Sequence, residues 1–488
     1  MPITLRGAIL ASMALLGACT LEPDYHRPSL PVANAYPAGP EYTSMVNLKI
    51  GNANSGSDAT ELGWKDFLHD ARLQKLIEIA LKNNRDLRIA ILNVESTRAQ
   101  YGIQRSEMFP TVALNGAAGR GRGNLALFEP GTTVSGAYTA YASVSWEVDL
   151  FGRVRSLEKA VLDQFLASTE ARKSAEILLV SEVANQYLTL VAADEALKVT
   201  DDSLNLAKES FRLAKLQYDT GTASELDLRE AEGVLEQVRA QSAAERRARA
   251  QTENGLVLLL GAPLPADLPQ GLRLDQQEIV TDIPAGLPSD LLVRRPDIVQ
   301  AEDQLMATNA NIGAARAAFF PSISLTGAAG SISPVLRDLF QSGTGAWGIQ
   351  SDAMLPLFNG RLNSANLEKA QAQRDIAVAQ YEKAIQVAFR EVADGLVARA
   401  TYEDQIDAQN HLVATQQRRV QLAQLRFKAG TDSYLTLLAA QTDLNNSQLS
   451  RTATRLDRLI NLITLYQDLG GGWLEHQGDV PRSGHNVP

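Results

Sequence analysis

Two very long stretches of the chain mix Leu and Ala with charged residues and lack helix breakers. From Ser156 to Tyr218 there is no Pro or Gly, and the common residues are those that lose least on entering a helix. Leu362–Ala429 is also free of Pro and has one Gly, Gly395. Each stretch predicts one helix, and at ~1.5 Å per residue roughly 60 residues span on the order of 90 Å.

The two predicted helices end in similar sequences and are followed by similar segments. The endings are Phe211–Thr222 and Val420–Thr431, in which Leu, Ala, Gly and Thr recur at matching places. Further helical segments follow, at Ala223–Leu260 and Asp432–Leu469. The chain is therefore predicted to contain two helical hairpins of one design.

A different period appears between Phe109 and Leu150. From Tyr138 to Asp149 apolar and polar residues alternate, which indicates a strand. The Gly-rich stretch Arg120–Gly136 is expected to be the hairpin loop before it. Such a strand suits either a half-buried soluble sheet or a membrane barrel with a wet lumen.

The second half of the chain repeats the first. Phe320–Gly330 copies Phe109–Gly119 nearly residue for residue, and a further strand is expected around Ala346–Leu355. An earlier helical period runs from about Leu68 to Glu107. The repeats are placed at 67–270 and 271–474, preceded by a tether at 19–66 and followed by a tail at 475–488.

The number of strands limits the possible assemblies. Two strands per half give about four per chain, whereas closed membrane barrels need about eight or more. An open sheet in lipid would leave its edge N–H and C=O groups unpaired. If these strands span a membrane, several chains must share one barrel, and the long helices would form a second tube beyond it.

The N-terminus is typical of a bacterial lipoprotein. Arg6 precedes an apolar run, Gly7–Leu16, of the length of a signal-peptide core, so residues 1–18 are predicted to be removed. Small residues lead to Cys19, the one cysteine, which is expected to carry acyl chains that anchor the protein. The alternative is an incidental cysteine at the end of an ordinary signal peptide.

Composition argues against two other classes of protein. The net charge of −10 and the pI of about 5.2 disfavour a nucleic-acid partner. The five His residues are scattered without metal-ligand spacing, and Gly343–Gly348 fits a dinucleotide motif only formally. No enzyme activity, metal or cofactor is predicted.

Several motifs resemble those of the TolC-like outer-membrane efflux factors, in the lipoprotein branch of RND-type systems. They cover essentially the whole mature chain: Cys19–Pro28, Asn83–Leu87, Arg294–Ile298, Ala301–Pro321 and Gly430–Leu438. The resemblance implies a mainly α fold with a membrane β-barrel, built as a homotrimer with a shared barrel of about 12 strands and a helical tunnel across the periplasm.

The resemblance also implies a function and partners. The protein would passively conduct small molecules, such as drugs, toxic compounds or metal ions, from an inner-membrane pump and a periplasmic adaptor to the outside. Two alternatives stay open: a duct for type I protein secretion, and a periplasmic coiled-coil scaffold without a pore. The sequence does not indicate the substrate or the partner pump.

Two residues near the second turn are candidates for a periplasmic gate. By resemblance, Asp432 lines the aperture, where three copies would narrow the pore and favour cations. The alternative is capping of the following helix, since Asp432 comes soon after Gly430. Arg426 is expected to bind an acidic residue of a neighbouring hairpin. In the first repeat, Thr222 and Glu225 are expected to form a capping box.

The turns themselves are candidates for adaptor contact. Gly221 and Gly430 are expected to end their helices in the left-handed conformation. The other candidates are Thr222, Thr431, Leu213, Ala214, Leu226, Leu422, Ala423 and Leu435. The alternative for the leucines is packing between neighbouring helices. Two departures from the family pattern are Arg361, where a second Gly is common, and Ala439, where Asp is often found.

Overall fold

The computed structural model describes residues 20–37, 39, 59–123, 133–280, 288–429 and 431–479. Cys19 and Gly430 lie outside these ranges. The chain divides into two compact units: the first comprises residues up to 29, 93–169 and 300–382, and the second comprises 30–92, 170–299 and 383 onward. Each unit therefore takes segments from both sequence repeats.

The long helices are confirmed. Helices α6 (Arg153–Asp219) and α10 (Leu362–Lys428) have 67 residues each. The returning helices, α7 (Glu225–Leu260) and α11 (Tyr434–Asp468), begin two residues later than predicted. Within the described ranges, no helix combines the length and apolarity needed to cross a membrane.

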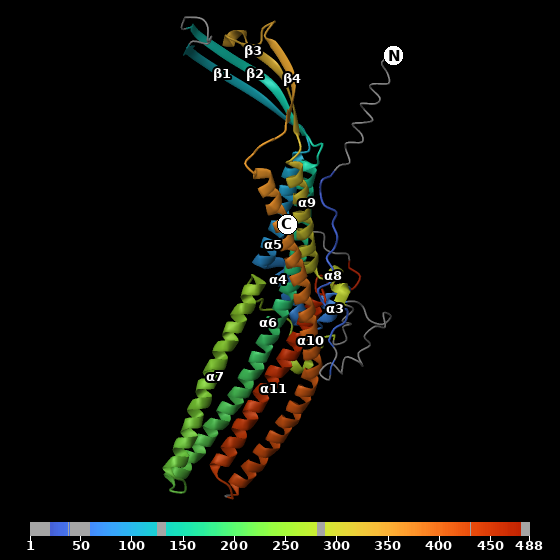
Figure 1. The fold of residues 1–488 in the computed structure, drawn as a ribbon. Coiled ribbons are helices and arrows are strands. Elements are labelled where there is room, and N and C mark those ends of the chain that lie inside the picture. Colours follow the sequence, from blue (N-terminus) through green and yellow to red (C-terminus); the bar gives the residue numbers. More distant parts are fainter. Residues whose placement is uncertain are drawn as a thin grey trace. The chain divides into compact units, whose positions relative to one another are not determined.

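In the second unit, four helical segments lie side by side in the order α7, α6, α11, α10 (Figure 1). Side-chain hydrogen bonds join each neighbouring pair: Ser242 to Asp201 (2.8 Å), Ser203 to Asn445 (2.8 Å), and Arg419 to Asp443 (2.6 Å). Helices α7 and α10 are thus the outer members of this row.

The shorter helices precede the strands. They are α3 (Trp64–Phe67), α4 (Ala71–Asn83), α5 (Arg85–Ser106), α8 (Leu291–Arg294) and α9 (Pro296–Ala317). The helical period predicted from about Leu68 to Glu107 is found, but it is divided between α4 and α5 by a break at Asn84. Its side chain accepts a bond from Leu87 N (2.9 Å) and donates one to Leu259 O (2.9 Å), so it caps α5 and ties it to α7.

One antiparallel sheet, with strand order β1-β2-β3-β4, lies in the first unit. The strands are β1 (Thr111–Gly123), β2 (Thr133–Val148), β3 (Ser322–Ser333) and β4 (Gly345–Met354). The four strands predicted for each chain are found within the described ranges. The predicted loop Arg120–Gly136 is too long, because Gly residues still pair their backbone groups, and the ladder continues to Gly123 opposite Thr133.

The register gives the sheet two chemically different faces. Cross-strand partners share a face, so the alternation predicted for β2 extends over all four strands. One face carries Val112, Leu114, Ala142, Val144, Trp146, Leu325, Trp347 and Ile349, and the other carries Asn115, Ser143, Ser145, Glu147, Ser324, Thr326, Gln350 and Asp352. The apolar face is uncovered: Leu114 is 86% exposed and Trp347 80%.

The N-terminal segment lies extended along α9 in the first unit. Arg316 donates to Leu21 O (3.2 Å) and Asn309 to Pro23 O (2.8 Å). Farther along, Arg27 binds both carboxylate oxygens of Glu302 at 2.7 Å. The expected tether is therefore bound to α9 at several points in the residues that follow the predicted lipidation site.

Candidate functional site at the hairpin tips

The two hairpin turns have the same backbone design. The N–H and hydroxyl of Thr222 both donate to Gln217 O, at 2.8 and 3.0 Å. Those of Thr431 donate in the same way to Arg426 O, at 3.0 and 3.0 Å. Gly221 has φ 74°, so the predicted left-handed helix end is confirmed there. The prediction for Gly430 concerns a residue outside the described ranges.

The caps differ between the two turns. The capping box expected at Thr222 and Glu225 is wrong: it is formed by Ser224 and Asp227, since the hydroxyl of Thr222 closes the turn instead. Hydrogen bonds from Ser224 hold the pKa of Asp227 below its usual range. The matching residue of the second turn, Ser433, makes no capping bond.

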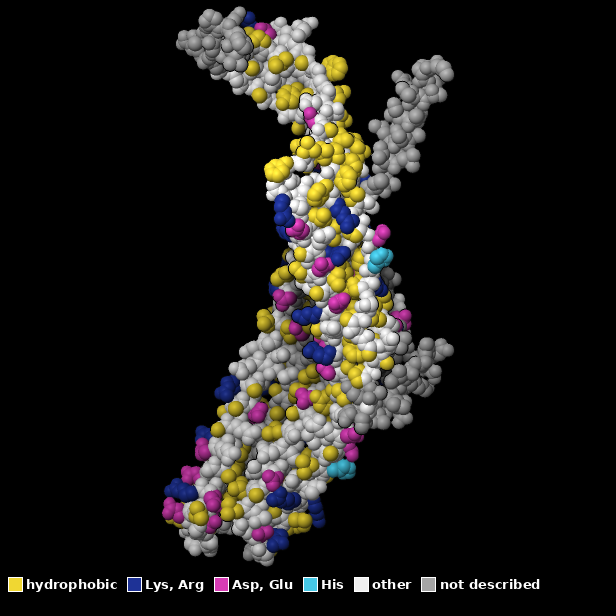
Figure 2. All heavy atoms as spheres, in the orientation of Figure 1, with side chains coloured by type: hydrophobic (Ala, Val, Ile, Leu, Met, Phe, Trp, Pro, Cys, Tyr) yellow, Lys and Arg dark blue, Asp and Glu magenta, His cyan; other side chains and the backbone are white. Residues whose placement is uncertain are grey.

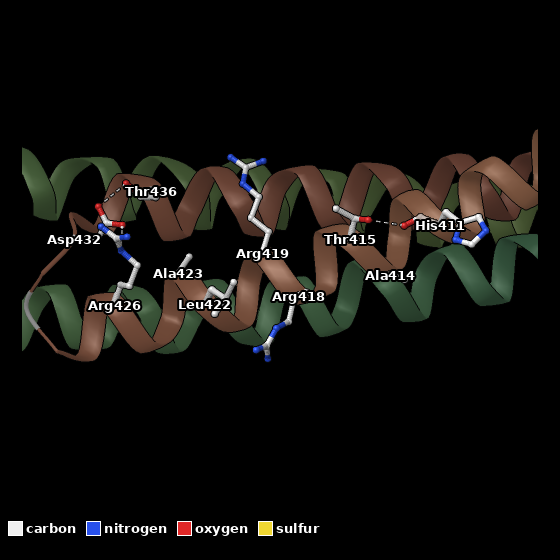
Figure 3. A pocket seen from close by; sticks show the side chains of 10 residues that line it. All are labelled: His411, Ala414, Thr415, Arg418, Arg419, Leu422, Ala423, Arg426, Asp432 and Thr436. Atoms are coloured by element: carbon white, nitrogen blue, oxygen red, sulfur yellow. Dashed lines mark hydrogen bonds and ion pairs between the residues drawn. The ribbon is translucent and has the colours of Figure 1, made fainter.

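Asp432 lies one residue before the N-cap of α11, so it does not cap the helix in the expected way. Its Oδ1 accepts bonds from Ser433 N and from the Thr436 hydroxyl, both 3.2 Å. Its Oδ2 lies 3.1 Å from Nε of Arg426, and Figure 3 shows the two side chains facing each other. In the chain, the acidic partner of Arg426 thus belongs to its own hairpin.

A groove runs along α10 toward this pair (Figure 3). It is lined by His411, Ala414, Thr415, Arg418, Arg419, Leu422, Ala423, Arg426, Asp432 and Thr436. Arg418 donates to Gln421 (3.1 Å) on its own helix, whereas Arg419 crosses to Asp443 of α11. The groove therefore combines an exposed leucine with three guanidinium groups.

The apolar candidates at the tips separate into two groups. Leu213, Leu226, Leu422 and Leu435 are all exposed, between 37% and 66%. Ala214 and Ala423 are buried, and Ala423 packs with Leu437 and Ala440. Packing between helices thus explains the alanines but, within the described chain, leaves the four leucines without a burying partner.

The two tips have opposite charge, which sequence reasoning missed. Residues 202–234 contain seven Asp or Glu and four Lys or Arg. The matching residues 411–443 contain two Asp and four Lys or Arg. Figure 2 shows charged side chains gathered at the ends of both hairpins. One tip is therefore net acidic and the other net basic.

A buried charge cluster was also missed, at a motif noted only for its resemblance. Arg295, which is 9% exposed, contacts Asp297 (2.7 Å), Glu391 (2.9 Å) and Asp468 O (3.3 Å). Burial raises the pKa of Asp468 to about 7, against the opposing effect of Arg295. The Arg-Arg-Pro-Asp sequence signals a helix start at Pro296, but only the fold brings Glu391 and Asp468 to it.

The surfaces of the tips combine apolar and charged side chains. Within the described ranges, no three His, Cys, Asp or Glu side chains could together hold a metal ion. What the tips offer is exposed leucines and guanidinium groups, with several carboxylates at the first tip and the Asp432 carboxylate at the second.

A family model described as outer membrane efflux protein matches residues 76–262 and 287–471, once in each repeat. The chain belongs to this family. The double match agrees with the internal duplication predicted from the sequence, and the efflux-channel identity is confirmed.

Named relatives agree with this membership. The chain is 46% identical over 468 residues to the antibiotic efflux pump outer membrane protein ArpC of Pseudomonas putida, covering 96% of this chain and 95% of that one. It is 45% identical over 466 residues to the solvent efflux pump outer membrane protein SrpC of the same species (95% and 97%). The open state of the Neisseria gonorrhoeae MtrE outer membrane channel matches with TM-score 0.84 and 38% identity, covering 94% and 100%. These proteins are channels and efflux components rather than enzymes.

Proposed function

We propose that this protein forms a homotrimeric outer-membrane channel that passively conducts small molecules delivered by an inner-membrane RND-type pump and a periplasmic adaptor. The observation that carries the proposal is the two-faced sheet. Its uncovered apolar face suits lipid, and its polar face suits a water-filled lumen.

The free strands β1 and β4 support the trimer. Among the residues that the structure describes, each presents one unpaired backbone edge, which is untenable in hydrocarbon. Pairing β4 of one copy with β1 of the next removes both edges. Three copies of four strands supply about 12, within the range of known closed barrels.

The lipid anchor is proposed at Cys19. The segment that follows it is bound along α9 as far as Arg27, so an acylated Cys19 would be tied closely to the first unit. Acyl chains would hold this end in the outer membrane, at ~0.8 kcal/mol per buried CH₂.

The hairpin tips are proposed to meet the adaptor and to gate the pore. The four exposed leucines supply apolar contact area, and the opposite charges of the two tips favour contact between unlike hairpins of neighbouring copies. Asp432 would line the aperture, with Arg426 neutralising it in the resting state.

Antibiotics and solvents are the proposed classes of cargo. ArpC is named for antibiotics and SrpC for solvents, and the chain is similar to both over nearly its full length. Since a pump usually selects and a duct conducts, the cargo is assigned only as a class.

Single-channel conductance in planar bilayers tests the proposal, with wild type beside Asp432→Ala. We expect a small, cation-preferring wild-type conductance that loses selectivity in the variant. Unchanged selectivity would remove Asp432 from the gate while keeping the pore. No conductance from folded trimers of either protein would favour a scaffold.

A further inference from the structure

One aromatic stack in the first unit joins the two halves of the chain. The rings of Phe151 and Phe320 are stacked, with centroids 4.8 Å apart and planes at 22°. Phe151 lies between β2 and α6, and Phe320 lies between α9 and β3. The stack therefore closes the end of the β2–β3 pair, next to the partners Val148 and Ile323.

The internal repeat places a second pair of phenylalanines in the same two positions. Phe109 corresponds to Phe320: each lies three residues after a helix and two before a strand. The N–H of Phe109 donates to Ser106 O (3.1 Å), and that of Phe320 to Ala317 O (3.0 Å). The two residues thus have the same local geometry.

Phe358 corresponds to Phe151 in the other position. Each follows a Leu after the end of its strand and comes shortly before a left-handed Gly that opens a long helix. These are Gly152 (φ 76°) and Gly360 (φ 59°). Both phenylalanines therefore stand on the segment that leaves the sheet for a hairpin.

Within the chain, this second pair is left apart. Phe358 is 92% exposed, its neighbour Leu357 is 90% exposed, and Phe109 is 60% exposed. Their counterparts Leu150 and Phe151 are half-buried. Two adjacent apolar side chains this exposed are unusual unless something covers them.

The strand edges indicate which molecule covers the exposed Phe109 and Phe358. Phe109 precedes the free strand β1, and Phe358 follows the free strand β4. In the repeat, Ala353 of β4 corresponds to Trp146 of β2, and Leu114 of β1 corresponds to Leu325 of β3. Because Trp146 lies opposite Leu325, the same register places Ala353 of one copy opposite Leu114 of the next. Both residues lie on the apolar face, so the two faces continue across the junction.

We propose that Phe358 of one copy stacks on Phe109 of the next copy, as Phe151 stacks on Phe320 within one chain. The inference rests on the proposed trimer and specifies its contact: a second copy of this chain, β4 against β1, closed by an aromatic pair. Offset stacking of two rings also fixes their relative position, so the pair sets the register of the junction.

Disulfide crosslinking of the full-length protein in its membrane tests the contact. Phe109→Cys with Phe358→Cys should give covalently linked dimers and trimers on oxidation, seen on non-reducing gels after heating. Neither single variant should do so, and mass spectrometry of the linked peptides distinguishes these bonds from any made by Cys19. The matched control, Phe151→Cys with Phe320→Cys, should link within one chain and keep the monomer mass.

A second measurement avoids the loss of the rings. Benzoylphenylalanine at Phe358 keeps an aromatic ring and should photo-crosslink to a peptide containing Phe109 of another chain. Trimers by light scattering with no link between positions 109 and 358 would overturn the aromatic contact and leave the trimer standing. Monomers would overturn both. Photo-crosslinking of position 358 to lipid alone would show that the membrane covers it and would also overturn the contact.

Discussion

The Nε atom of Arg426 lies 3.1 Å from Oδ2 of Asp432, across the turn that joins α10 to α11. The other carboxylate oxygen is bound to Ser433 and Thr436, so Asp432 is fully engaged within its own hairpin. Because Arg426 is largely exposed, the ion pair contributes about 1 kcal/mol or less. A partner of either sign at the tip could therefore displace it at small cost.

Loss of this pair should change ion selectivity. In Arg426→Ala the Asp432 carboxylate loses its neutralising cation, so we expect a stronger preference for cations, measured as the reversal potential in a KCl gradient. Arg418→Ala is the matched control, since Arg418 lines the same groove but, in the described part of the chain, bonds only to Gln421. The exchange Arg426→Asp with Asp432→Arg should return the potential toward wild type. A wild-type reversal potential in Arg426→Ala would show that the pair does not act on the pore.

The buried cluster around Arg295 should make stability depend on pH. Burial raises the pKa of Asp468 from 3.8 to about 7, and the charged groups that act on it are Arg295, Glu391 and Asp297. Between these two values the folded state holds a proton that the unfolded state has released. The contribution of this group to the free energy of unfolding is therefore fully present below pH 4. As the pH rises toward 7, the free energy of unfolding falls by up to ~4 kcal/mol.

Asp468→Asn should remove this loss, because the amide stays neutral. We expect the free energy of unfolding of the variant, relative to wild type, to rise by about 3 kcal/mol from pH 4.5 to pH 8. Urea unfolding in detergent, followed by tryptophan fluorescence, measures it. Asp443→Asn, on the same helix but half-exposed, is the matched control for the loss of a carboxylate. Parallel curves for Asp468→Asn and wild type would refute the titration.

Local pattern predicted most of the fold but little of the side-chain pairing. The helix expected at Ser156–Tyr218 and the alternation of β2 were found, because periods of 3.6 and 2 need only the local sequence. The break at Asn84 was missed; its side chain caps α5 locally through Leu87 and also binds Leu259, 175 residues away. The capping box was misplaced by two residues because the turn uses Thr222 itself. The Arg295 cluster depends on the tertiary fold, which local sequence patterns do not specify.

The entry to α10 contains a strained residue. Arg361 has φ 71°, the one non-Gly positive φ within the described ranges. Its guanidinium reaches Glu368 (3.2 Å), but both side chains are exposed, so that contact contributes little. The left-handed conformation costs an Arg ~1–2 kcal/mol.

Relief of this strain should stabilise the protein. Arg361→Gly removes the strain from the folded chain, but Gly also makes the unfolded chain more flexible, which offsets part of this effect. We expect a net increase of about 0.5–1 kcal/mol in the free energy of unfolding. Thermal unfolding in detergent should show a higher Tm. Glu368→Ala controls for the lost ion pair and should leave Tm unchanged, while Gly360→Ala, also at positive φ, should lower it. A lower Tm in Arg361→Gly would mean that the side chain has a stabilising contact in the assembly.

Glu302 holds the N-terminal segment to the first unit. Its side chain is 8% exposed and accepts two bonds from Arg27 (2.7 Å each) and one from the Tyr25 hydroxyl (2.9 Å). Burial, followed by the hydrogen bond to Glu302, raises the pKa of Tyr25. The three bonds share one carboxylate, so a single truncation releases both residues.

Glu302→Ala should therefore free the segment without unfolding the protein. Each hydrogen bond to a charged group contributes ~1.5–3 kcal/mol, so the loss of even one should make opening of this segment about 10- to 100-fold more frequent, and the loss of all three should increase it further. Chymotrypsin, which cuts after Tyr25, measures the opening through the rate at which the shortened chain appears. Glu368→Ala removes an exposed carboxylate from the same unit, and this variant should be cleaved at the wild-type rate. Glu302→Gln keeps the shape of the side chain but not its charge, so its cleavage rate should lie between those of Glu302→Ala and Glu368→Ala. If Glu302→Ala is cleaved no faster than wild type, the contacts from Leu21 and Pro23 to α9 hold the segment by themselves.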